Sequence, residues 1–103
     1  MQLTKAINLY PKPNGTKADE RLTVSSTGVS FATTFDITTG YVLIDVQDAD
    51  VMVTFDGSTP TSTNGHRYNS GEREYWSRQK AQAAKFIRQA STDAAVQASQ
   101  FTD

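Results

Sequence analysis

The chain has 103 residues, so one domain is expected. Its formal net charge of −1 argues against a nucleic-acid partner, and the absence of cysteine excludes disulfides, thiolate metal sites and cysteine nucleophiles. No apolar run reaches the roughly 18 residues of a membrane helix, and the first residues lack the apolar core of a signal peptide, so neither membrane insertion nor secretion is expected. Fourteen threonines and nine serines favour an all-β fold.

Residues 1–20 are expected to form an N-terminal arm that precedes a domain over residues 21–103. Short alternation of Leu3, Ile7 and Leu9 is followed by Pro-Lys-Pro-Asn-Gly at 11–15, which interrupts a strand ladder because proline lacks an amide donor. Such an arm either pairs at a sheet edge or extends toward a partner.

Period-two alternation begins at Leu22. It predicts strands at 22–25, 29–31 and 35–37, separated by Gly- and Thr-containing turns. The segment 41–46 is apolar on both faces, which indicates a central strand with Val42, Ile44 and Val46 directed inward. A polar loop of four residues links it to the apolar run 51–55, and this arrangement predicts a hairpin.

The second half of the chain continues with short elements. A polar turn and loop cover 56–65, and alternating charge and bulk at 72–76 predicts an edge strand. Ser77 is a candidate helix cap before a short helical turn or loop at 78–83. Strands are expected at 84–89 and 94–101. Short strands separated by turns describe a single-domain β-sandwich or small barrel.

Charge is segregated along the chain. Residues 1–18 carry three lysines and no acid, residues 19–58 carry seven acids against Arg21 alone, and residues 66–88 carry six bases against two glutamates. These charges either belong to a solvated surface or form complementary edges that meet between neighbouring copies.

No catalytic, cofactor or metal site is expected. His66 as a hydrolase base would need a positioned nucleophile and acid, so a structural role is the simpler interpretation. Asp45, Asp48 and Asp50 either form a solvated turn or hold a weakly bound cation. Tyr75 and Trp76 offer a stacking platform for a sugar, and with nearby arginines they leave a weaker nucleic-acid alternative. An edge strand that docks on a partner, or burial of Trp76 in the core, explains the same pattern.

Three stretches of the sequence carry a resemblance to a known group of proteins. They are Val-Met-Val-Thr-Phe-Asp-Gly-Ser-Thr-Pro-Thr at 51–61 followed by Asn-Gly-His at 64–66, Ala-Lys-Phe-Ile-Arg at 84–88, and Thr-Asp-Ala-Ala-Val at 92–96. Together they resemble small virion proteins of tailed bacteriophages, over roughly residues 40–101. The resemblance implies a compact β-sandwich of jelly-roll type, present in many copies on a particle and without catalytic residues.

The leading hypothesis is a capsid cement or decoration protein on the virion exterior, which clamps neighbouring major capsid subunits as a dimer or trimer. A neck, tail or baseplate adaptor of the same virion is the alternative, followed by a carbohydrate-binding module. The expected interface consists of aromatic and basic side chains, which protein interfaces favour. These residues are Lys5, Tyr10, Lys12, Arg67, Tyr68, Tyr75 and Trp76.

Overall fold

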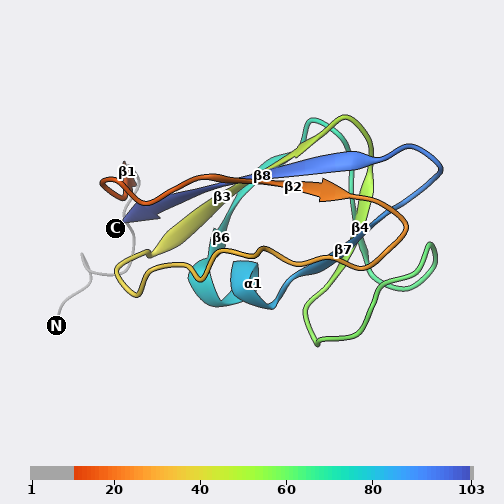
Figure 1. Ribbon diagram of the computed structural model, residues 1–103, viewed down its shortest axis with the longest axis horizontal. Coiled ribbons are helices and arrows are strands. Elements are labelled where there is room, and N and C mark those ends of the chain that lie inside the picture. The colour runs from red at the N-terminus through yellow and green to blue at the C-terminus, as the bar shows by residue number, and fades with distance from the viewer. Residues whose placement is uncertain (1–10, 103) are drawn as a thin grey trace, which may run out of the picture.

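A computed structural model describes residues 11–102, and this part of the chain is mostly β-strand (Figure 1). One antiparallel sheet, called the five-stranded sheet, is centred on β8 (Ala94–Thr102), which pairs with β3 (Tyr41–Gln47) on one side. On its other side β8 pairs with β1 (Lys12–Pro13) and β2 (Glu20–Val24), and β3 in turn pairs with β6 (Arg73–Ser77).

The second sheet, called the three-stranded sheet, has the order β5-β4-β7. It consists of β5 (His66–Tyr68), β4 (Val51–Thr54) and β7 (Lys85–Arg88), all antiparallel. The expectation of an all-β fold is therefore confirmed as two antiparallel sheets, with α1 (Arg78–Ala83) as the one helix of residues 11–102.

The core draws its side chains from both sheets. In β3, Val42, Ile44 and Val46 are buried and alternate with half-buried residues, as the period-two pattern predicts. The other strands of the five-stranded sheet add Val24, Trp76 and Val96, and the three-stranded sheet adds Val51, Val53 and Phe86. One apolar cluster thus joins the two sheets.

The predicted hairpin between 41–46 and 51–55 is wrong. β3 pairs with β8 and β6, whereas β4 pairs with β5 and β7, so the loop between β3 and β4 crosses from one sheet to the other. Asp48 takes a positive φ of 73° in this loop, and the Ala49 amide donates to the Gln47 carbonyl over 2.8 Å. A short polar loop between two apolar strands fits a hairpin and a crossing between sheets equally well, so its composition did not decide the pairing.

The segment after β2 departs from the predicted strands at 29–31 and 35–37. It contributes a single bridge, in which Val29 and Phe86 exchange backbone hydrogen bonds of 3.0 and 2.8 Å at the edge of β7. The side chains of Phe31 and Phe35 are buried in the core although the backbone here is irregular, while the Ile37 side chain is 84% exposed. Figure 1 shows this segment passing beside α1 and β7.

The remaining elements lie close to the positions that the sequence predicts. The Ser77 hydroxyl accepts from the Lys80 amide over 3.1 Å, which confirms it as the N-cap of the short helix at 78–83. β6 is an edge strand, β7 lies within the strand expected at 84–89, and β8 extends one residue beyond the strand expected at 94–101. Within the expected arm, Lys12 and Pro13 pair with Thr102 and Phe101, at a sheet edge where proline is tolerated.

Candidate functional site

Tyr68, Glu74 and Trp76 come together where the edges of the two sheets meet. The Tyr68 hydroxyl donates to Glu74 Oε1 over 3.0 Å, and Trp76 Nε1 donates to the same oxygen over 2.6 Å. The rings of Tyr68 and Trp76 lie edge to face, with centroids 5.5 Å apart. Burial and the bond to Glu74 raise the pKa of Tyr68 to about 12. One carboxylate therefore links β5 of one sheet to β6 of the other.

Lys80 of α1 covers this cluster from the solvent side. Its Nζ lies 4.8 Å from the ring centroid of Trp76 and 5.3 Å from that of Phe55, at cation–π distance. The same Nζ lies 3.8 Å from Glu74 Oε1. The cluster is therefore internally neutralised and its aromatic faces are already occupied.

Trp76 corrects an expectation from the sequence. Its side chain is only 1% exposed and stacks on Phe86, with ring centroids 6.2 Å apart and planes 5° from parallel. Tyr75 points to the opposite face of β6 because neighbouring side chains alternate along a strand. Trp76 therefore offers no ring to a partner, and the two residues form no joint platform for a sugar.

Tyr75 belongs to an apolar patch on the outer face of the five-stranded sheet. The strand register places Tyr75 opposite Leu43, and Tyr41 opposite Phe101. The Tyr75 ring centroid lies 5.4 Å from that of Phe101 and 6.3 Å from that of Tyr41, both edge to face. We call Tyr41, Leu43, Tyr75 and Phe101 the outer aromatic patch.

The other expected interface residues are dispersed. Arg67 is exposed on β5, where Nη2 lies 2.6 Å from Asp50 Oδ2 and Nε donates to Asn69. Lys12 is exposed on β1, at the far side of β8 from β3. Lys5 and Tyr10 lie outside the described residues. Tyr68 and Trp76 are in contact, whereas Arg67 lies on the other side of β5 because neighbouring side chains alternate along a strand. Tyr75 and Lys12 lie elsewhere.

Many of the charges that are segregated along the sequence form ion pairs within the molecule. Asp45 and Asp50 of the acidic segment pair with Arg73 and Arg67 of the basic segment, at 3.7 and 2.6 Å. Asp48 pairs with Arg21 at 3.1 Å. Three aspartates that looked like a cation site thus face three different arginines, and residues 11–102 contain no group of acidic and histidine side chains suited to a metal ion.

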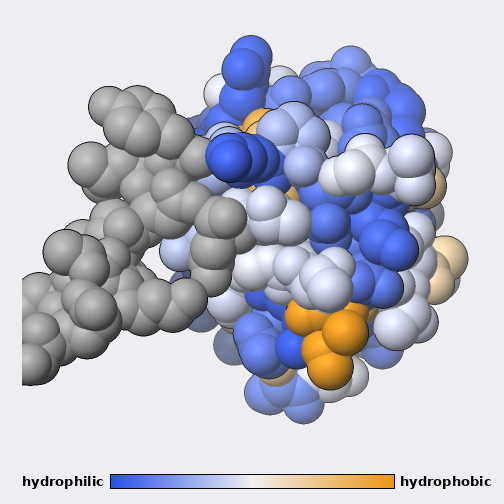
Figure 2. All heavy atoms as spheres, turned by 90° about the vertical axis from the view of Figure 1, so that its left-hand side faces the viewer, coloured by the Kyte–Doolittle hydropathy of each residue, from blue (hydrophilic) through white to orange (hydrophobic). Residues whose placement is uncertain are grey.

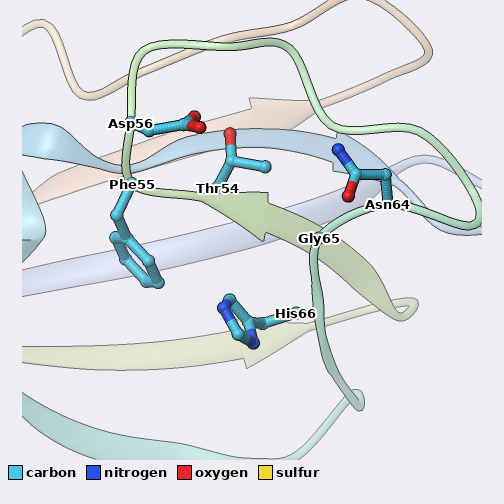
Figure 3. A pocket seen from close by; sticks show the side chains of 6 residues that line it. All are labelled: Thr54, Phe55, Asp56, Asn64, Gly65 and His66. Carbon is cyan, nitrogen blue, oxygen red and sulfur yellow. The ribbon is translucent and has the colours of Figure 1, made fainter.

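A surface hollow of about 440 Å³ lies beside the loop that joins β4 to β5. Figure 3 shows the rings of Phe55 and His66 on one side of it, with Asp56 and Asn64 on the loop. His66 is exposed, and its ring centroid lies 6.0 Å from that of Phe55. The Asp56 carboxylate accepts hydrogen bonds from the backbone N–H and the hydroxyl of Ser58. The structure therefore places His66 against an aromatic ring.

No family model, curated protein or solved structure matches this chain. In the part of the chain that the structure describes, no helix is long and apolar enough to cross a membrane. The function is therefore inferred from the residues and their geometry.

Sequence reasoning missed the outer aromatic patch although the signal was present. Once Val42, Ile44 and Val46 are directed inward, Tyr41 and Leu43 must face outward. Phe101 was placed on the last strand, but its position opposite Tyr41 depends on the pairing of β3 with β8, which are separated by about half the chain.

Proposed function

We propose that this protein is a structural component of a bacteriophage particle, a cement or decoration protein that binds between neighbouring major capsid subunits on the capsid exterior. One observation carries the proposal beyond the sequence resemblance. Residues 51–54, 66 and 85–88, which belong to the stretches that resemble phage virion proteins, fall on the three adjacent strands β4, β5 and β7. Two of the three stretches therefore map onto one continuous sheet and the loop at its end, while the third, 92–96, leads into β8 of the five-stranded sheet.

The geometry favours a static binding role. The ring contacts of Trp76 with Tyr68 and Phe86 and the hydrogen bond of Tyr68 to Glu74 cross between the two sheets. The outer aromatic patch leaves apolar surface on a sheet face. A small rigid domain of this kind gains avidity from being repeated on a symmetric particle. The finer expectations of a jelly-roll topology and an extended arm over residues 1–20 belong to this proposal, as do assembly into a dimer or trimer and the interface roles of Lys12, Arg67 and Tyr75.

Copy number in purified particles tests the proposal. Quantitative mass spectrometry of virions from the phage that encodes the chain should give a ratio to the major capsid protein of order one. Small copy numbers that match a single ring of subunits would favour the alternative, a neck, tail or baseplate adaptor. Absence from the particle would overturn both forms of the proposal.

A carbohydrate-binding role retains less support. Its predicted platform required Tyr75 and Trp76 on one face, and the burial of Trp76 removes that arrangement.

A further inference from the structure

The outer aromatic patch is unusual for the solvent face of an antiparallel sheet, which is commonly polar. Tyr75 is 47% exposed, one of two large hydrophobic residues that stand out as exposed among residues 11–102. Its neighbours Tyr41, Leu43 and Phe101 are half-buried on the same face. Aromatic side chains with one free face are the type that interfaces enrich.

The patch is confined to one end of the sheet. One step further along the strands, the same face carries the ion pair of Asp45 with Arg73. Beyond it lie the ion pair of Arg21 with Asp48 and the contact of Arg21 with Gln47. The patch thus has a polar border on the side away from the C-terminus.

β1 lies at the apolar end. Pro13 pairs with Phe101, and Lys12 pairs with Thr102, so the chain before Pro11 starts beside the patch. Figure 2 views the molecule from this end, where most of the described surface is hydrophilic or pale. Residues 1–10 read Met-Gln-Leu-Thr-Lys-Ala-Ile-Asn-Leu-Tyr and supply the apolar side chains Leu3, Ile7 and Leu9.

The reach of this segment is ample. Ten extended residues span at most about 33–36 Å, whereas the three strands that carry the patch cover only about 10 Å across. Two prolines govern its direction, because the residue before a proline is biased toward extended backbone. Tyr10 precedes Pro11 and Lys12 precedes Pro13, so a tight reversal onto the chain's own patch is disfavoured at this point.

We infer that residues 1–10 of one copy dock on the outer aromatic patch of a second copy. Leu3, Ile7 and Leu9 supply the apolar contacts, and reciprocal exchange of two such segments closes a symmetric dimer. The inference rests on the self-association within the proposed function and is independent of where the protein sits in a virion. A virion test and a solution test can therefore fail separately.

Sedimentation of the full chain over a range of concentrations tests the inference. The wild-type chain should associate, while Leu3→Ser/Ile7→Ser/Leu9→Ser and Leu43→Thr/Tyr75→Thr should each sediment at the monomer mass with an unchanged far-ultraviolet spectrum. Ile37→Thr alters an exposed residue outside the patch and should leave association intact. Mixing the two multiple variants should restore association, because one intact patch then meets one intact segment.

Three outcomes would overturn the inference. The wild-type chain could be a monomer, either multiple variant could still associate, or the mixture of the two could stay monomeric at the highest concentration reached. Cross-linking keeps the test valid if a patch variant fails to fold. The chain has no cysteine, and Ser99 lies opposite Leu43 in the patch. Mild oxidation of Ile7→Cys/Ser99→Cys should give disulfide-linked dimers, and Ile7→Cys/Ile37→Cys should not. A disulfide formed within one chain would show docking on the same copy and overturn the exchange.

Discussion

The hydroxyl of Tyr68, on the three-stranded sheet, donates a 3.0 Å hydrogen bond to Glu74, on the five-stranded sheet. Because Trp76 donates to the same carboxylate oxygen, the contact anchors the buried indole as well as the two sheet edges. A hydrogen bond to a charged group contributes roughly 1.5–3 kcal/mol, so this carboxylate is a principal polar tie between the sheets.

The first prediction concerns alkaline pH. The pKa of Tyr68 is raised to about 12 in the folded protein by burial and Glu74, against an ordinary value of 10.0. A raised folded-state pKa gives a stabilisation that is fully present below pH 10 and is lost as the pH rises through about 12. The free energy of unfolding measured by urea titration should therefore fall across this interval.

Tyr68→Phe provides the control for the alkaline effect. The variant should be less stable than the wild type at neutral pH, because Glu74 loses a donor. Its stability should decline less between pH 10 and about 12, and its absorbance titration should lack the tyrosine with a pKa of about 12. An alkaline decline identical to that of the wild type would show that another group is responsible.

The second prediction concerns the two faces of β6. Trp76→Ala should lower the free energy of unfolding by about 3–5 kcal/mol, because it removes a fully buried ring. Tyr75→Ala, the adjacent residue on the opposite face, should cost about 1 kcal/mol or less in the monomer. Urea denaturation at low protein concentration measures both.

Fluorescence checks the same placement independently. Trp76 is the one tryptophan of the chain, so its emission reports a single site. The native protein should emit at shorter wavelength than the urea-unfolded chain and resist quenching by acrylamide. Native emission that matches the unfolded chain would place the indole at the surface and contradict the structure.

Local patterns predicted the strands well where one face is buried. The alternation in 41–46 fixed which side chains of β3 enter the core, and Ser77 marked the start of α1. These features depend on neighbouring residues, and the strand period of two and the N-cap hydrogen bond are set by local geometry.

Pairing between distant strands was beyond the sequence alone. The assignment of β3 and β4 to different sheets depends on β8 and β7, which lie far along the chain. The burial of Trp76 depends on Phe86 and Tyr68, and the outer aromatic patch depends on the register that sets Tyr41 against Phe101. A shift of one residue in that register would have reversed both faces.

The third prediction concerns acid. The Ser70 amide, which donates to Asp50 over 2.8 Å, and the Arg67 guanidinium hold the pKa of Asp50 below its ordinary value of 3.8. A lowered folded-state pKa gives a stabilisation that is present above that value and is lost as the pH falls through the folded pKa. Asp50→Asn should therefore show a smaller loss of stability than the wild type when the pH is lowered from about 5 to about 2.

Thermal unfolding across this pH range measures the acid effect. Asp19→Asn offers a matched control, because it removes an exposed aspartate for which the structure shows no ion pair within residues 11–102. Its pH profile should follow that of the wild type. If Asp50→Asn and Asp19→Asn gave the same profile, the contacts of Asp50 with Ser70 and Arg67 would not be responsible.

The fourth prediction concerns the loop that carries the Asn-Gly-His motif. Gly65 has a φ of +138°, and a Cβ there would lie 3.1 Å from the Val53 carbonyl oxygen and 3.2 Å from Pro60 Cβ. Gly57, in the same loop, has a φ of +88° with no atom within 4 Å of a Cβ. Gly57→Ala therefore incurs backbone strain alone, of about 1–2 kcal/mol, whereas Gly65→Ala adds a steric conflict with buried backbone and proline.

Paired urea denaturation of the two variants isolates the steric part of the cost. Gly65→Ala should be the less stable of the two, and it should also displace His66, which follows it directly at the start of β5. The chemical shifts of the His66 ring should then change in Gly65→Ala and stay near the wild-type values in Gly57→Ala. Equal stability of the two variants would mean that the loop relaxes away from Val53 and Pro60, and that the close approach at Gly65 does not hold the Asn-Gly-His loop in place.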